Sequence, residues 1–314
     1  MTENKAPADA PAVDPLADSG VVIVDKPAGM TSHDVVGKLR RVFKTRRVGH
    51  SGTLDPMATG VLVIGVNRGT RFLPHVHADS KSYDATIRLG AATLTDDMEG
   101  EVLSTADTSH VTDEAIHTEV AALTGDIMQR PASVSAVKID GVRAHERIRR
   151  GETVVLPERP VTVSRFDVLD IRRHTDDAGN HLDIDVSVDC SAGTFIRALA
   201  RDLGAALGVG GHLIALRRTA AGTFTIADAQ TLESLQEATH PRMSLSLDEA
   251  CVRCFPTRDI TEEQGRDLAL GKWLEPIGLA GVHAALMPNG QVPALITESG
   301  KRAKTVFVVR PSTL

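Results

Sequence analysis

Long apolar runs, cysteine and aromatic residues are all scarce in this chain of 314 residues. Its apolar runs, such as 61–64, are far shorter than the roughly 18 residues that a membrane span needs, and no charged-then-apolar signal pattern opens the chain. Three cysteines are too few for a disulfide framework, which fits a reducing compartment. We therefore expect a cytoplasmic protein.

Positive charge is also in deficit. The formal net charge of −6 counts against a nucleic-acid partner, because a polyanion is attracted by positive potential. The distribution is uneven, however: residues 89–129 contain nine acidic residues and neither Lys nor Arg. Two basic clusters stand apart from this stretch, namely Lys38, Arg40, Arg41, Lys44, Arg46 and Arg47, and then Lys138, Arg143, Arg147, Arg149 and Arg150. Both are candidate phosphate-binding surfaces, although a solvated helix face is the commoner role of such a run.

Length and composition indicate an ordinary globular protein with one large and one small domain. Hydrophobic residues make up 42% of the chain and charged residues 24%, so disorder over most of it is excluded. Residues 1–19 are rich in Ala, Pro and Asp and predict a disordered tail. We expect the large domain at 20–245 and a small β-rich domain at 246–314, where short apolar runs alternate with Gly and Pro.

Hydrophobic periodicity predicts a mixed α+β fold. Strands are expected at 21–24, 61–66, 83–89 and 182–188, and helices from Thr31 or Ser32 to about 43, at 112–123 and at 195–207. The strands and helices alternate without regular βαβ spacing. A mixed, mainly antiparallel sheet is therefore favoured over a doubly wound one.

The turn-rich segment 49–60 is the first candidate for chemistry. Three glycines, a proline and the carboxylate of Asp55 lie between a basic helix and a buried strand, where scaffolds often present a reactive loop. Pro56 restricts the backbone at Asp55, so the carboxylate could be held in one place. The same dipeptide also starts ordinary turns, and local sequence does not decide between the two roles.

Six blocks in this order resemble the bacterial TruB family of tRNA pseudouridine synthases over about residues 20–220. They are Asp25-Lys26-Pro27-x-Gly29-x-Thr31-Ser32, Gly49-His50-x-Gly52-x-Leu54-Asp55-Pro56-x-Ala58-x-Gly60, Lys81-Ser82-Tyr83, Pro131-x-x-x-Ser135-Ala136-x-Lys138, Cys190-Ser191-x-Gly193-Thr194-Phe195-Ile196-Arg197, and Leu216-Arg217-Arg218. The resemblance implies a pseudouridine synthase fold with a central catalytic cleft. It also implies a cofactor-independent isomerase that converts the T-loop uridine at tRNA position 55 to pseudouridine.

The resemblance further assigns Asp55 as the catalytic aspartate and Tyr83 and Arg197 as active-site residues. Asp55 could attack the sugar or the base, or assist loss of a ribose proton, and the sequence leaves these routes open. Arg197 could pair with Asp55 and keep it ionised and oriented. Tyr83 could stack on a uracil flipped out of the loop, with its hydroxyl near C5.

RNA contacts are expected at His50, Lys26, Lys138, Arg46 and Arg47. For Lys26 the sequence also favours an architectural role beside the catalytic loop, and His50 could instead stabilise a turn. The C-terminal segment only weakly resembles the PUA-type RNA-binding domain that is common in this family. Two further departures, His145 where the family has an aromatic and Thr93-Leu94-Thr95 where it has Thr-Asp-Thr, lie outside the catalytic residues.

No cofactor or metal is expected. Cys251 and Cys254 lack a second ligand pair at zinc spacing, Asp96, Asp97 and Glu99 suggest a solvated loop, and no nucleotide-binding glycine motif is present. The expected partner is the T-arm of tRNA, without a membrane or protein partner, and a monomer is the default.

Three rival functions stay open. They are an RNA-binding or tRNA-folding protein, a carboxylate-based glycosidase, and a guide-RNA-dependent synthase of the same family. The glycosidase lacks an evident second carboxylate, and the absence of a Lys-rich tail disfavours the guide-dependent enzyme.

Overall fold

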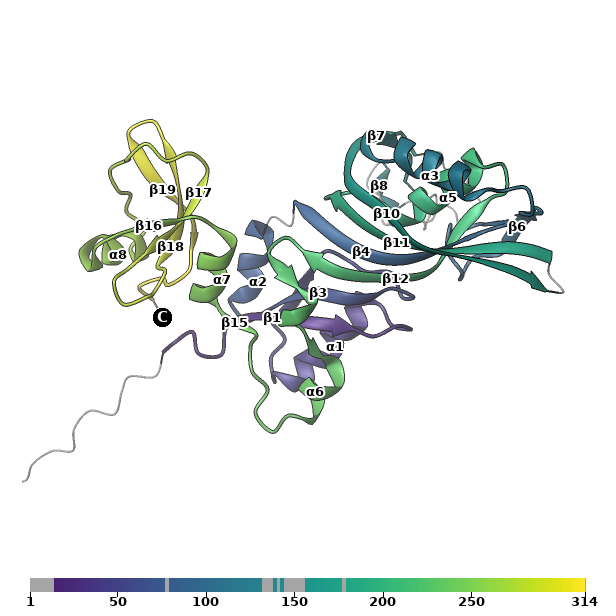
Figure 1. The fold of residues 1–314 in the computed structure, drawn as a ribbon. Helices are drawn as coiled ribbons and strands as arrows, with labels where there is room; N and C mark the ends of the chain where they lie inside the picture. The colour runs from purple at the N-terminus through teal and green to yellow at the C-terminus, as the bar shows by residue number, and fades with distance from the viewer. Residues whose placement is uncertain are drawn as a thin grey trace, which may run out of the picture.

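A mixed sheet organises the larger part of the protein, as Figure 1 shows for a computed structural model that describes residues 14–76, 79–131, 138–139, 142–143, 156–176 and 179–313. Within these residues eleven strands form the sheet, with a central order β14-β1-β3-β12-β4-β11-β10-β7. Their bounds are β14 Gln230–Thr231, β1 Gly20–Lys26, β3 Thr59–Val66, β12 Gly211–Ala221, β4 Ser80–Leu89, β11 Gly179–Ser191, β10 Arg159–Asp176 and β7 Gly125–Gln129. Three short strands pair at its sides, β2 Val48–Ser51 with β3, β13 Phe224–Thr225 with β12, and β15 Leu245–Ser246 with β1. Among the described strand pairs of this sheet only β1·β14 and β3·β12 are parallel, so the predicted, mainly antiparallel α+β fold is confirmed.

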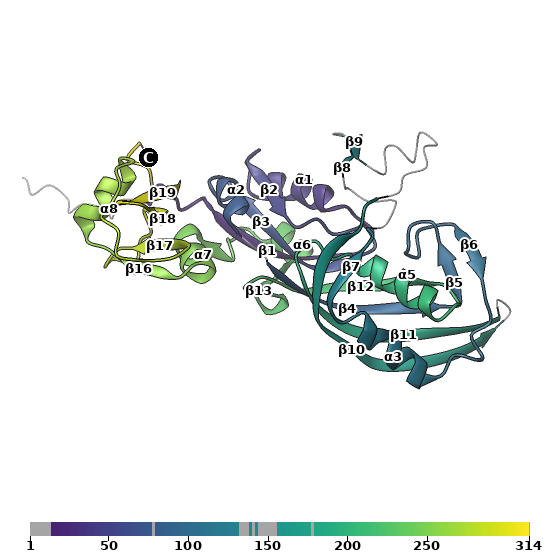
Figure 2. The ribbon, with the colours of Figure 1, turned by 90° about the horizontal axis from the view of Figure 1, so that it is seen from above.

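The three predicted helices are present on this sheet. They are α1 (Ser32–Val42), α3 (Asp113–Ala122) and α5 (Ile196–Ala206). The side chain of Thr31 caps α1 and that of Thr112 caps α3 by accepting a hydrogen bond from a first-turn N–H. Both views show α3 and α5 on the same side of β10 and β11 (Figures 1 and 2). Their apolar stripes share one core cluster with alternate residues of β4 and β11.

Shorter elements complete the large domain. Two helices, α2 (Gly69–Phe72) and α6 (Leu232–Glu237), and two 3₁₀ turns, η1 (Leu73–His75) and η2 (Ile226–Asp228), lie near β1, β3 and β12. Two hairpins are separate from the main sheet, β5 (Ala91–Thr93) with β6 (Val102–Thr105) and β8 (Lys138–Ile139) with β9 (Val142–Arg143). No helix in the described ranges is long and apolar enough to cross a membrane.

The C-terminal segment forms a second sheet, the yellow-green lobe of Figure 1. Its strands are β16 Thr257–Asp259, β17 Val282–Leu286, β18 Ala294–Ser299 and β19 Arg302–Val308, and its helices are α7 Leu247–Cys254 and α8 Glu262–Ala269. This is the β-rich segment that the sequence predicts.

A shared core fixes this lobe to the large domain. Phe72 of α2 packs against Phe255 and Phe307, with ring centroids 6.2 and 6.3 Å apart. Arg68 donates a 2.6 Å hydrogen bond from Nε to the carbonyl of Val309. Because alternate residues of β1 point to opposite faces, Val21 and Ile23 join this junction core while Val22 and Val24 join the core beneath α1.

The predicted disordered tail is wrong for its last six residues. Leu16 is buried in the junction core, and Asp14 makes 2.8 Å ion pairs with Arg310 near the chain end. The composition of the tail does not reveal this attachment. One buried leucine and one ion-paired carboxylate are enough to hold a short segment against the folded domain. Residues 1–13 lie outside the described part of the chain.

Candidate active site

Asp55 lies in the loop between β2 and β3, and this loop is held at several points. The Ser32 hydroxyl, at the start of α1, accepts a 2.9 Å hydrogen bond from the backbone N–H of Leu54 and donates a 3.2 Å bond to its carbonyl. At the far end, Gly60 has φ +98° and a Cβ atom there would meet the backbone oxygen of Arg218 at 2.2 Å. Only glycine fits that position. The loop is therefore fixed by the strands and helix on either side of it.

Lys26 belongs to the same support. Its side chain is fully buried, and its ammonium group donates hydrogen bonds to the carbonyls of Pro27, Met30 and Pro56 at 2.9, 2.6 and 3.2 Å. Burial lowers the pKa of Lys26, and the nearby Asp55 charge opposes that shift. The expected direct RNA contact of Lys26 is therefore corrected: its three donors are directed to the protein backbone, and its role is architectural.

Arg197 joins two carboxylates at the start of α5. Its Nε lies 3.1 Å from Oδ2 of Asp55, and its Nη1 lies 3.2 Å from Oδ2 of Asp97 and donates a 2.8 Å bond to the carbonyl of Thr95. The Asp55 side chain is 37% exposed, whereas the side chains of Arg197 and Asp97 are 10% and 4% exposed. The structure thus holds Asp55 at the open end of a buried charge network.

Asp97 is the functional candidate that the sequence interpretation missed. The solvated loop expected at Asp96 and Asp97 is wrong, because both are buried and paired, Asp96 with Arg201 at 3.2 Å and Asp97 with Arg197. The available signal was two adjacent carboxylates in a segment without a basic residue. Such acids need cations from elsewhere in the chain if they are buried, and α5 supplies both.

Tyr83 and Asp55 line one cavity of about 210 Å³, together with Thr53, Leu54, Lys81, Gly193, Thr194, Phe195, Ile196, Arg197 and Leu216. This volume is below the roughly 300–1,000 Å³ of drug-sized ligand sites and suits a single planar base. Tyr83 is the first inward residue of the buried part of β4, and Leu216 comes from the neighbouring strand β12. The structure therefore brings together the three predicted active-site residues.

The side of the cavity formed by Tyr83 and Lys81 has two cations close to it, Lys81 in the wall and Arg218 behind Tyr83. Burial lowers the pKa of Lys81 and raises the pKa of Tyr83, and the charge of Arg218 opposes the shift at Tyr83. Burial also raises the pKa of Cys190, beside Lys81 on the next strand, to about 11, so this thiol stays protonated at neutral pH. A neutral phenol and two nearby cations form an environment that favours negative charge on a bound base.

The other predicted RNA-contacting residues lie outside the cavity wall. Arg46 and Arg47 are exposed beyond the C-terminus of α1, as a phosphate-binding surface requires. His50 is half-buried on β2, and its Nδ1 has no hydrogen-bond partner among the described residues. Burial lowers the pKa of His50, so a neutral ring is favoured. Lys138 lies on β8, but its side chain is outside the described residues, as is most of the second basic cluster.

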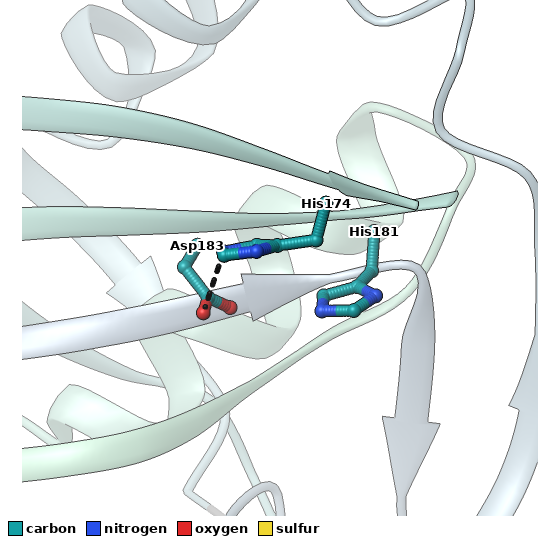
Figure 3. A group of neighbouring side chains, drawn as sticks. All are labelled: His174, His181 and Asp183. Carbon is teal, nitrogen blue, oxygen red and sulfur yellow. Dashed lines mark ion pairs between the residues drawn. The ribbon is translucent and has the colours of Figure 1, made fainter. Parts of the chain in front are cut away.

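A separate cluster of His174, His181 and Asp183 lies on the opposite face of the sheet (Figure 3). Nε2 of His174 lies 3.2 Å from Oδ2 of Asp183, and the two imidazoles stack with an interplanar angle of 18°. A metal ion lies in the plane of each imidazole that binds it, and nearly parallel rings share no such point. Arg88 also pairs with both oxygens of Asp183, at 2.7 and 2.8 Å. This arrangement is typical of a surface ion-pair cluster.

Three regions of the chain match sequence models of known domains. Residues 40–196 match the N-terminal domain of TruB family pseudouridylate synthases, residues 197–254 the C-terminal domain of tRNA pseudouridylate synthase B, and residues 255–310 the C-terminal domain of tRNA pseudouridine synthase II. The chain is 65% identical over 301 residues to the tRNA pseudouridine synthase B of Corynebacterium efficiens, covering 96% of this chain and 99% of that protein. It is 55% identical over 314 residues to the protein of that name from Nocardia farcinica, covering 100% and 99%. Among solved structures, an H/ACA RNP bound to a substrate RNA containing 2′-deoxyuridine shares the fold at 23% identity, with a TM-score of 0.71 over 94% of this chain and 86% of the other.

Proposed function

The chain belongs to the TruB family of pseudouridylate synthases, and on that premise we propose that it isomerises the uridine at position 55 in the T-loop of tRNA to pseudouridine. The observation that carries the proposal is the Asp55–Arg197 pair, 3.1 Å between Oδ2 and Nε, at the wall of a base-sized cavity that Tyr83 also lines. The reaction breaks the bond between ribose C1′ and uracil N1 and joins C1′ to C5; C5 then loses its proton to solvent, and N1 takes up a proton. The proposed exchange uses no cofactor.

Asp55 is placed to act on the ribose of the bound uridine. Its carboxylate is the exposed member of the charge network, so it can reach a cation-like ribose while Arg197 holds one oxygen. Nucleophilic attack on the sugar or the base and removal of a ribose proton all remain compatible with that position. Arg197 is the orienting group, and its own orientation comes from Asp97 and the Thr95 carbonyl.

Tyr83 is placed to stack on the uracil of the bound uridine. A uridine in a folded loop must leave its stack to enter the cavity, at a cost of roughly a few kcal/mol. A flat ring beside the entering uracil recovers part of that cost by stacking. The exposed residues Arg46 and Arg47 would hold the T-arm phosphates near the cavity, and His50 would contact the displaced loop.

We further propose a stand-alone, monomeric enzyme of the cytoplasm with its catalytic domain at 20–245. The small domain, at 246–314, is fixed to it through the shared core at Phe72 and Phe307. It would extend the tRNA-binding surface without moving relative to the cavity.

The test uses an unmodified tRNA transcript carrying tritium at uridine C5, with no added cofactor. Wild-type protein should release tritium and leave one pseudouridine, at position 55. Asp55→Asn should lower the rate by about 10³-fold or more while tRNA binding stays within about threefold. Release of free uracil would indicate a glycosidase instead, and binding without release would indicate an RNA-binding protein. Turnover retained by Asp55→Asn would contradict the assignment of the site.

A further inference from the structure

Five consecutive residues, 193–197, line the cavity and end with Arg197. They lead from β11 into the first turn of α5, where Phe195 is the N-cap residue and Arg197 the second residue of the helix. The backbone at a helix start needs hydrogen-bond partners from outside the helix. The phenyl ring of Phe195 has no polar atom to offer one. The segment that carries Arg197 therefore needs a partner from another element.

Gln129, the last residue of β7, supplies that partner. Its Oε1 accepts a 2.8 Å hydrogen bond from the backbone N–H of Phe195, and its Nε2 donates a 3.1 Å bond to the carbonyl of the same residue. In a capping box the N–H of the N-cap residue is bonded by a Glu or Gln three positions later, but that position is Ala198 here. A glutamine 66 positions earlier in the chain takes its place.

The amide of Gln129 is buried for the sake of these two bonds. Gly125 and Ile127 share the inward face of β7 with Gln129, which is only 1% exposed. Burying an amide is unfavourable unless its donor and its acceptor both find partners, and the backbone of Phe195 provides both. An apolar residue would fill this position if packing alone were required. The amide is therefore explained by the backbone that it fixes.

Arg159 holds the same segment from the neighbouring strand. It lies directly opposite Gln129 in the β7·β10 register. Its guanidinium carbon lies 4.5 Å from the centroid of the Phe195 ring, and its Nη2 donates a 3.0 Å hydrogen bond to the carbonyl of Gly193. Two cross-strand neighbours at one end of the main sheet therefore fix residues 193–195.

The backbone and the guanidinium of Arg197 are held by different groups. The guanidinium lies 3.1 Å from Asp55 and 3.2 Å from Asp97, whereas the backbone continues directly from that of Phe195. The guanidinium can reach both carboxylates only if α5 starts in this place. A displacement of about 1 Å at a reacting group, caused by a change elsewhere, can lower a rate by about 100-fold. The geometry at Asp55 therefore depends on what fixes Phe195.

We propose that Gln129 is a positioning residue for the isomerisation, which fixes the start of α5 so that Arg197 meets Asp55. Gln129 is bonded to the backbone of a wall residue and is not itself among the described residues that line the cavity. It acts through Arg197 and not on the substrate. This role rests on the proposed function and deepens it, because the orientation of Asp55 then depends on the end of the sheet as well as on the charges around Arg197.

The test is a double-mutant cycle with the tritium-release assay under single-turnover conditions. Gln129→Met keeps the length of the side chain and removes both bonds. Gln230→Met is the matched control, because Gln230 lies on β14, at the opposite end of the strand order, and donates bonds to the Arg242 carbonyl at 3.3 Å and to Ser244 Oγ at 3.1 Å. Each change is made with Arg197 and with Arg197→Met. The maximal rate, the half-saturating enzyme concentration and the thermal midpoint are measured for every variant, with rates taken well below the lowest midpoint.

Gln129→Met should lower the maximal rate by about 30-fold and change the half-saturating concentration by less than about threefold. In the Arg197→Met background the same change should cost less than about threefold, because the group through which Gln129 acts is already absent. Gln230→Met should stay within about twofold in both backgrounds, although it also loses buried hydrogen bonds.

Equal losses in the two backgrounds would overturn the proposal, because Gln129 would then act on the fold or the cavity without Arg197. A loss confined to the half-saturating concentration would overturn it too, since Gln129 would then shape tRNA binding. If Gln129→Met does not fold, Gln129→Glu, which keeps the acceptor and loses the donor, decides in the same way in the two backgrounds. Absence of tritium release by the wild-type protein would overturn the proposed function itself, a result distinct from additive losses in an active enzyme.

Discussion

The two faces of the sheet at β4, β10, β11 and β12 differ in how their charged residues are paired and buried. On the outer face each of four arginines pairs with aspartates and stays 36–42% exposed, in the pairs Arg88–Asp183, Arg165–Asp189, Arg172–Asp185 and Arg217–Asp25. On the inner face Arg197 and Arg218 are buried at the cavity. Arg197 is held between two carboxylates, and Arg218 donates hydrogen bonds to the backbone carbonyls of Val61 and Gly52.

This difference separates structural from functional charge. An exposed ion pair contributes about 0–1 kcal/mol, because water and salt screen it. A buried cation is screened much less and acts strongly on its neighbours, at a large desolvation cost. On the inner face, the desolvation cost arises at the arginines beside the cavity, where the proposed reaction develops charge. On the outer face, the exposed ion pairs keep the surface of the sheet hydrated.

The largest contrast is expected between Arg197→Met and Arg172→Met. Removal of Arg197 leaves Asp55 without the group that orients it, so the single-turnover rate of tritium release should fall by about 10³-fold, equivalent to about 4 kcal/mol. Arg172→Met, on the outer face, should change the rate by less than about twofold. Similar rates for the two variants would break the comparison.

The second prediction concerns Asp97, which touches Arg197 but does not line the cavity. Asp97→Asn removes the charge that holds the far side of the guanidinium, so the rate should fall by about 10- to 100-fold with little change in tRNA affinity. Asp185→Asn is the matched control, because its partner is an exposed arginine. A loss confined to tRNA affinity would show that Asp97 shapes the binding surface instead.

The third prediction sharpens the comparison within the outer face. Asp183 is its exception, since the carboxylate is only 8% exposed while it pairs with Arg88 and His174. Asp183→Asn should lower the free energy of unfolding in urea by about 2 kcal/mol, because Arg88 loses a two-pronged partner. Asp167→Asn, 54% exposed, should stay within about 0.5 kcal/mol. Equal effects would show that burial does not decide the strength of these pairs.

The smallest effect is expected at the junction of the two lobes. Hydrogen bonds from Arg253 of α7 lower the pKa of Asp228 to about 2, from an ordinary value of 3.8. A carboxyl with a lowered pKa in the folded state stabilises the protein above pH 3.8, and this stabilisation is lost as the pH falls toward 2. Wild type should therefore exceed Asp228→Asn by about 1–2 kcal/mol at pH 5, and the gap should narrow between pH 4 and 2. A gap that is constant with pH would exclude this linkage.

Local patterns in the sequence predict four strands of the main sheet, β1, β3, β4 and β11, and the helices α1, α3 and α5. Alternation from Tyr83 to Leu89 places the inward face of β4 correctly, and the capping residues Thr31 and Thr112 mark the starts of α1 and α3. The burial of Asp97 and the attachment of Leu16 escape this approach, because each depends on a partner far along the chain. The burial of Lys26 is also missed, because local sequence cannot identify a charged residue as fully buried.

By itself the sequence determined the periodicity of the predicted strands and helices, the turn-rich segment around Asp55 and Pro56 and the blocks that identify the family, because these depend on neighbouring residues. Only the tertiary structure decided which charges meet. Arg197 lies 142 positions after Asp55 and 100 after Asp97, and Arg218 lies 135 after Tyr83. These residues come together through the register of the sheet and the placement of α5. Their burial reduces the screening of their charges by water, which strengthens their effect on one another.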